Sequence, residues 1–205
     1  MEFDPEVHHR RSIRLREFDY SQPGAYFVTL CAFNKECLFG QVVDGQMRMN
    51  AMGEIVHEEW FRSGRIRLEI ELGAFVVMPN HIHGIVRIVG AHGVRRDVGA
   101  NGVCPPAATA GGRAKEGERR SPLPMRPRSV ASFVAGFKSA TTRRMRELHA
   151  TMCRSVWQRN YYEHIVRNER ELSQIREYIA TNPLRWAFDR ENPEADRPGD
   201  ETPWT

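Results

Sequence analysis

The sequence has little of what would place it in a membrane or in an oxidising compartment. Its longest apolar run, Ala74 to Met78, is far shorter than the roughly 20 residues that span a bilayer. The first residues lack a basic stretch followed by an apolar one, so no secretory leader is predicted. The sequence holds only 4 cysteines, and their spacing matches neither a Cys-x-x-Cys metal site nor a disulfide framework. We therefore expect a cytoplasmic protein with reduced thiols and no membrane partner.

What is present indicates one globular domain interrupted by an insertion. The chain has 205 residues, of which 40% are hydrophobic and 27% charged, as in soluble globular proteins. Residues 91–128 hold eight basic and three acidic residues, six glycines and five prolines, without any hydrophobic period. Such a composition predicts a flexible basic insertion, which either attracts phosphates or is merely a solvated linker. The predicted divisions are an N-terminal arm (1–24), two halves of a domain (25–90 and 129–190), the insertion (91–128) and a disordered tail (191–205).

The first half of the domain predicts strands around one helix. Residues 25–32 are rich in β-branched and aromatic side chains, which favour a buried strand. Residues 41–43 and 46–49 flank Asp44-Gly45, a strong signal for a hairpin with a type I′ turn. Asn50 can cap a helix whose apolar residues recur at helical spacing up to Trp60. Residues 66–77 and 81–89 are two further extended runs. The order ββαββ predicts an antiparallel sheet with a helix packed on it.

The second half predicts two helices separated by an extended segment. Ser129 can cap a helix that runs to about His149, with apolar residues on one side and arginines on the other. Residues 157–167 have an extended pattern. Asn168, followed three residues later by Glu171, is typical of a capping box. That last helix is expected to end at Asn182, because the following proline disfavours the helical conformation of the residue before it.

A pair of histidines, His81 and His83, is the first candidate for chemistry. Side chains alternate between the two faces of a strand, so both imidazoles are expected on the same face, where they can share one divalent ion. Eight histidines in the chain give about 0.3 such His-x-His matches by chance, so the motif alone is weak.

The second candidate lies on the last predicted helix. Tyr178 and Asn182 are one helical turn apart on the shoulder of its buried stripe, so their oxygens face the same neighbourhood. A boundary tyrosine and a C-capping asparagine would explain the same pattern structurally.

Several stretches taken together resemble the HUH-type single-tyrosine transposases, and most of all the branch of REP-associated tyrosine transposases. The matching stretches are Phe75 to Val86, which contains His81 and His83; Phe137 to Ser139; Trp157 to Asn168; and Tyr178-Ile179 before Asn182-Pro183. The resemblance covers roughly Ser12 to Trp186 without the insertion, and neither the insertion nor the tail fits the pattern. It implies an α+β fold, a ferredoxin-like or RRM-like sandwich of an antiparallel sheet with helices packed on one face.

The resemblance also implies an activity. His81, His83 and Asn182 would hold Mg²⁺ or Mn²⁺, and Tyr178 would attack single-stranded, hairpin-containing DNA to leave a 5′-phosphotyrosine and a free 3′-hydroxyl. His164 is a candidate for orienting a ligand or the phosphate, or else a buried structural histidine. Tyr161 and Tyr162 are rival nucleophiles. The protein would act as a monomer or a homodimer.

DNA contacts are expected from basic side chains of the second half. The candidates are Lys138, Arg143, Arg144 and Arg159. Two other functions stay open: a catalytically idle protein of the same fold that binds hairpin DNA or RNA, and a metal-dependent hydrolase of nucleotides. The hydrolase would need a further carboxylate near the histidines, and none follows within the strand.

Overall fold

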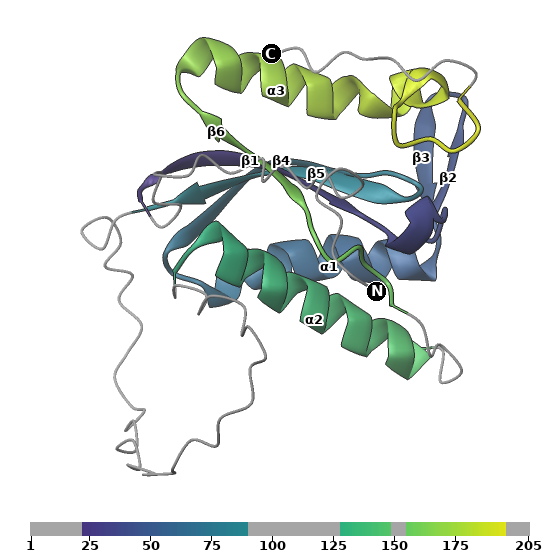
Figure 1. Cartoon of the computed structure of the whole chain (residues 1–205), viewed down its shortest axis with the longest axis horizontal. Helices are drawn as coiled ribbons and strands as arrows, with labels where there is room; N and C mark the ends of the chain where they lie inside the picture. Colours follow the sequence, from purple (N-terminus) through teal and green to yellow (C-terminus); the bar gives the residue numbers. More distant parts are fainter. Residues whose placement is uncertain (1–21, 90–127, 149–154, 196–205) are drawn as a thin grey trace, which may run out of the picture.

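The computed structural model describes residues 22–89, 128–148 and 155–195. Almost all of the predicted arm and insertion, and the end of the tail, lie outside these residues. Six strands, three α-helices and two short 3-10 helices follow one another in the described chain (Figure 1). The first half consists of β1 (Gly24–Cys31), η1 (Phe33–Lys35), β2 (Gly40–Val43), β3 (Gln46–Met49), α1 (Ala51–Ile66), β4 (Ile70–Val77) and β5 (His81–Ile88). The second half consists of α2 (Val130–Leu148), β6 (Tyr162–Val166), α3 (Glu169–Thr181) and η2 (Asn182–Phe188).

Four strands form the main sheet in the order β4-β5-β1-β6, and all neighbours are antiparallel. β1 pairs with β5 on one side and with β6 on the other, and most of its eight residues are buried. β2 and β3 form a separate hairpin. Asp44 and Gly45 at its tip both have positive φ angles, 53° and 70°, as a type I′ turn requires.

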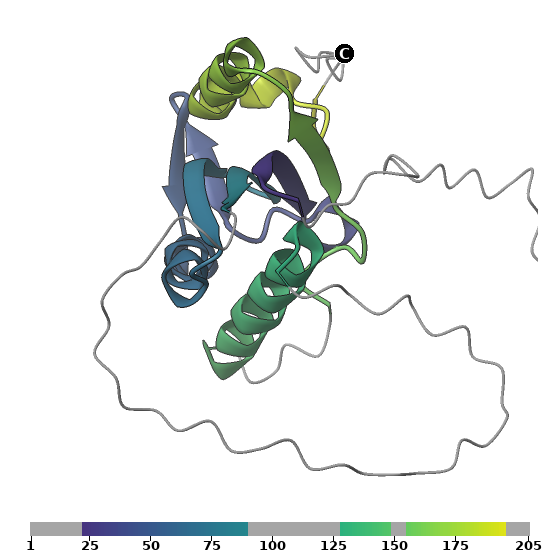
Figure 2. The same cartoon turned by 90° about the vertical axis from the view of Figure 1, so that its left-hand side faces the viewer.

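The helices lie on both faces of the sheet (Figures 1 and 2). α1 and α2 cover one face, where Trp60, Phe133 and Phe137 pack with Val28 and Leu30 in the larger hydrophobic core. α3 covers part of the opposite face through Leu172, Ile175 and Ile179, which pack against Phe27 and Ile85. The fold is therefore the α+β sandwich with an antiparallel sheet that was predicted, with α1 and α2 on one face and α3 added on the other.

Gly84 lets α1 approach the sheet closely. A Cβ atom at this position would lie 2.4 Å from Cζ2 of Trp60. The Trp60 ring also stacks on Phe75, with 4.4 Å between the ring centres. Only a glycine after His83 leaves room for this indole. In the sequence His81-Ile82-His83-Gly84, the histidines therefore point to one face of the sheet, and Gly84 lets Trp60 pack on the other.

Most predicted elements are present, and their ends differ for local reasons. Asn50 caps α1 by accepting from the backbone N–H groups of Met52 and Gly53. α1 continues to Ile66, so β4 begins at Ile70 and not at residue 66. The extended segment predicted for 157–167 pairs as a strand only over β6. Asn182 keeps helical angles (φ −57°, ψ −42°), so Pro183 does not push it out of the helical region, and the chain continues into η2.

The described residues contain no helix that is both long and apolar enough to cross a membrane.

Candidate functional site

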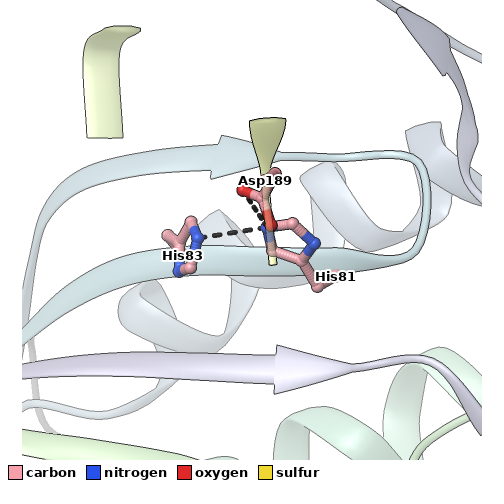
Figure 3. Close-up of side chains that lie close together, drawn as sticks. All are labelled: His81, His83 and Asp189. Carbon is pink, nitrogen blue, oxygen red and sulfur yellow. Dashed lines mark hydrogen bonds and ion pairs between the residues drawn. The ribbon is translucent and has the colours of Figure 1, made fainter. Parts of the chain in front are cut away.

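The predicted histidine pair lies on the sheet face that α3 covers. His81 and His83 are separated by one residue on β5, so both side chains point to that face. They pair with Cys31 and Thr29 of β1, respectively. Both are buried, with 0% and 4% of their surfaces exposed. Their Nε2 atoms lie 3.0 Å apart, so the two rings point at the same spot, as the strand alternation predicts (Figure 3).

Each imidazole is held at its other nitrogen. Nδ1 of His81 lies 2.8 Å from Oδ1 of Asn80, and Nδ1 of His83 lies 2.8 Å from Oγ1 of Thr29. Phe27 stacks on the His83 ring, with 5.3 Å between ring centres. These contacts fix both rings with Nε2 facing inward.

Tyr178 reaches the histidines from α3. Its hydroxyl oxygen lies 3.3 Å from Nε2 of His83, and its ring packs edge-on against His83 and Phe27. The helix points Tyr178 at the sheet because Leu172, Ile175 and Ile179 form the buried stripe beside it.

Asn182 lies at the C-terminal end of α3 and is 1% exposed. Its Nδ2 group donates to Oδ2 of Asp189 at 3.3 Å. Its buried Oδ1 atom has no hydrogen-bond partner among the described residues. The structure thus brings His81, His83, Tyr178 and Asn182 to one place.

Asp189 is a member of the site that the sequence analysis missed. It follows η2, and its Oδ2 atom lies 3.9 Å from Nε2 of His81 (Figure 3). With His81 and His83 it forms a group of three side chains that could hold a metal ion. The polar region after Phe188 has no period, so no sequence signal indicated that the chain returns to the sheet here.

Glu191, which falls in the predicted disordered tail, also contacts the site. Its carboxylate pairs with Lys35 at 3.1 Å, and its backbone carbonyl accepts from Nδ2 of Asn80 at 2.6 Å. The described chain therefore runs past residue 190 along the site and continues to residue 195.

Burial dominates the electrostatics of the site. It lowers the pKa of His81, although Asp189 opposes the shift, and lowers that of His83 well below its usual range, helped by the neighbouring His81. Both rings are therefore neutral at pH 7. Burial also raises the pKa of Tyr178, and the Asp189 carboxylate raises it further. The hydroxyl is accordingly protonated in the absence of a cation.

The donor set fits a divalent ion. Two cis ligands about 2.1 Å from an octahedral ion lie about 3.0 Å apart, which matches the separation of the two Nε2 atoms. The buried Oδ1 of Asn182 and the carboxylate of Asp189 add oxygen donors. A mixed set of imidazole nitrogen and oxygen suits Mn²⁺ better than Mg²⁺.

His164 and the rival tyrosines have other partners. Nε2 of His164 lies 2.7 Å from Oε1 of Glu171, which ties β6 to the first turn of α3. The hydroxyl of Tyr161 donates to Glu163 at 2.8 Å. Tyr162 packs edge-on against Phe27, so it is the rival on the same face as the histidines.

The predicted DNA-binding side chains are not all free. Nζ of Lys138 donates to the carbonyls of Gln158 and Asn160, and Arg144 pairs with Glu58 and Glu59 of α1. Arg143 is exposed, 4.0 Å from Glu147, and Arg159 is also exposed. Lys138, Arg143 and Arg144 belong to α2 and hence to the face of the sheet away from the histidines (Figure 1).

A cavity of about 600 Å³ lies beside α2. It is lined by Lys138, Ser139, Thr142, Arg143, Arg146, Glu147, Ser155 and Trp157. Arg143 and Arg146 bring exposed positive charge to this cavity, whereas Trp157 is only 5% exposed and its indole N–H donates to Thr141.

Comparison with solved structures identifies the fold. The chain aligns with a REP-associated tyrosine transposase bound to a REP hairpin, with a TM-score of 0.51 and 18% identity over 84% of this chain and 74% of that chain. It also aligns with a transposase candidate from Deinococcus radiodurans, with a TM-score of 0.38 and 17% identity over 82% of this chain and 96% of that chain. The fold is that of the REP-associated tyrosine transposases of the HUH type.

A relative in sequence defines the family. An uncharacterised protein of Haemophilus influenzae is 37% identical over 190 residues, which are 92% of this chain and 96% of that protein. The chain belongs to the same family as this protein. No protein-family model matches it.

Proposed function

We propose that the protein is a metal-dependent strand transferase and endonuclease that acts on single-stranded, hairpin-containing DNA through Tyr178. The observation that carries the proposal is the position of the Tyr178 hydroxyl, 3.3 Å from a pair of histidines whose Nε2 atoms converge. The fold, shared with a transposase that was solved with a hairpin, supports it.

His81, His83 and Asn182 would hold the ion, with the carboxylate of Asp189 within reach of the same place. When bound, a divalent ion supplies positive charge that neutralises a phosphate oxygen and favours the phenolate of Tyr178 over the phenol. This charge is needed because burial and Asp189 raise the pKa of the hydroxyl.

The reaction of Tyr178 is a transesterification. The bond from its Oη to phosphorus forms while the bond from phosphorus to the 3′ oxygen breaks. The phenol loses its proton, and the 3′ oxygen gains one as it leaves. The product is a 5′-phosphotyrosine and a free 3′-hydroxyl, and a second 3′-hydroxyl can reverse the attack and be joined without ATP.

The test uses end-labelled single-stranded hairpin DNA and Mn²⁺. Wild type is expected to form a covalent adduct that survives denaturing electrophoresis. Tyr178→Phe is expected to form none while binding the hairpin with unchanged affinity, because the ring and its packing against Phe27 and His83 remain.

Tyr162→Phe is the matched control, because this tyrosine lies on the same sheet face and also packs on Phe27. An adduct that persists in Tyr178→Phe and maps to Tyr161 or Tyr162 would reassign the nucleophile. Wild type that binds hairpins but forms no adduct with Mn²⁺ or Mg²⁺ would be a catalytically idle binder of hairpin DNA or RNA.

A further inference from the structure

The two histidines of the site have outer partners of different chemistry. His81 faces an amide oxygen of Asn80, whereas His83 faces the hydroxyl of Thr29, both at 2.8 Å. All four side chains are buried. The inference below rests on the metal site of the proposed function and concerns how these two partners prepare the imidazoles.

The orientation of the Asn80 amide follows from its other contacts. Its Nδ2 group lies 3.0 Å from the carbonyl oxygen of Lys35 and 2.6 Å from that of Glu191. Carbonyl oxygens only accept hydrogen bonds, so the NH₂ end must face them and Oδ1 must face His81. Because an amide oxygen also only accepts, Nδ1 of His81 carries the proton and its Nε2 keeps a free lone pair.

Thr29 places no such restriction on His83, because a hydroxyl can donate or accept. The 3.0 Å contact between the two Nε2 atoms decides the tautomer without metal. Nε2 of His81 carries no proton. If Nε2 of His83 carried none either, the lone pairs of the two nitrogens would face each other at 3.0 Å. His83 therefore presents Nε2–H to His81, the Tyr178 hydroxyl oxygen at 3.3 Å accepts from the same N–H, and the Thr29 hydroxyl donates to Nδ1 of His83. Both rings are neutral in this arrangement.

We propose that Asn80 and Thr29 are positioning residues that set the tautomers of the metal ligands. Asn80 locks His81 in the form that can bind a metal, and Thr29 lets His83 exchange tautomers when the ion arrives. In that exchange one proton leaves Nε2 of His83 for solvent and one enters at Nδ1 from solvent, so the ring stays neutral and no net proton is released. The Thr29 hydroxyl turns from donor to acceptor.

The tautomers are measured by long-range ¹H–¹⁵N correlation of the imidazole rings in the ¹⁵N-labelled full chain. Without metal, His81 is expected as Nδ1–H and His83 as Nε2–H. With Zn²⁺, a diamagnetic ion that binds imidazole, His83 is expected as Nδ1–H. His81 found as Nε2–H, or His83 found as Nδ1–H before metal is added, would overturn the assignment.

Variants separate positioning from folding. Thr29→Val keeps the shape but leaves Nδ1–H of His83 without an acceptor in the metal-bound form. We expect about a 10- to 100-fold loss of Mn²⁺ affinity by calorimetry, unchanged tautomers without metal, and recovery in Thr29→Ser. Asn80→Ala should give mixed tautomers of His81, because no amide oxygen then accepts from its Nδ1.

Failure of this inference differs from failure of the proposed function. Wild-type Mn²⁺ affinity in Thr29→Val would refute the role of Thr29 while leaving the metal site intact. Wild type that binds neither Mn²⁺ nor Zn²⁺ would refute the metal site and the exchange, while the tautomers of the metal-free protein still decide whether Asn80 locks His81.

Discussion

At the scale of single residues, four neutral side chains converge on one point beside the carboxylate of Asp189. The imidazoles are held at Nδ1, the Tyr178 hydroxyl is protonated, and the buried Oδ1 of Asn182 lacks a partner among the described residues. A buried polar atom without a partner costs about 1–3 kcal/mol, which a bound cation would offset.

Removal of both histidines tests this arrangement. His81→Ala combined with His83→Ala should abolish adduct formation with Mn²⁺, because only oxygen donors would remain. The double variant should still unfold cooperatively by circular dichroism, because the cores on both faces of the sheet are built by other residues. Adduct formation that persists in this variant, or in wild type with a chelator, would remove the metal from the mechanism.

At the scale of elements, strands and helices were predictable where local chemistry decides them. Asn50 and Asn168 cap their helices as the sequence predicts, and Asp44-Gly45 forms the expected turn. The periods of one strand and one helix predict that the two histidines share a face and that Tyr178 and Asn182 do too, whereas their roles as ligands and nucleophile come from the family resemblance. Thr29, Asp189 and Glu191 could not be found in this way, because only tertiary structure brings them to β5.

Gly84 connects the site strand to the core beneath it. Gly84→Ala should destabilise the fold by about 1–3 kcal/mol, because the new methyl group would collide with the Trp60 indole at 2.4 Å. Urea denaturation measures this effect. Gly24→Ala is the control, because its Cβ would meet nothing closer than 3.7 Å. Equal midpoints for the two variants would contradict the proposed contact.

The junction of β6 and α3 predicts a dependence of stability on pH. Burial would raise the pKa of Glu171, but hydrogen bonds from the Arg167 backbone N–H and from His164 outweigh it, so the pKa lies below its ordinary value of 4.5. A carboxyl whose pKa is lower in the folded state stabilises the fold above its unfolded pKa and loses this effect as pH falls.

Glu171→Gln should therefore lower the urea midpoint at pH 7. The difference in urea midpoint between wild type and the variant should become smaller as pH falls below 4.5. Taking the difference between the two proteins cancels the titration of groups that do not interact with residue 171. A gap that stays constant through this range would show that the carboxylate is not preferentially charged in the folded state.

At the scale of the whole molecule, the sheet separates the histidine site from the cavity beside α2. The histidines and Tyr178 lie on the face that α3 covers, whereas α1 and α2 cover the opposite face (Figure 1). Arg143 and Arg146 of α2 line the cavity. Lys138 and Arg144 are engaged within the protein. Of the basic groups that the sequence analysis singled out for the proposed DNA contact, this leaves Arg143, Arg159 and the segment 91–128, most of which lies outside the described residues.

Deleting residues 94–127 tests this segment. It joins β5 to α2, and its sequence has no hydrophobic period, so we expect the fold and the Tyr178 adduct to survive. Loop closure entropy changes only slowly with length, which limits the effect on stability. The deletion removes seven basic residues. If about three of them contact phosphates, the slope of log affinity against log salt should fall by roughly 2 to 3 units, at ~0.7 to 0.9 per contact. An unchanged slope on the same hairpin would show that the deleted residues make no phosphate contacts.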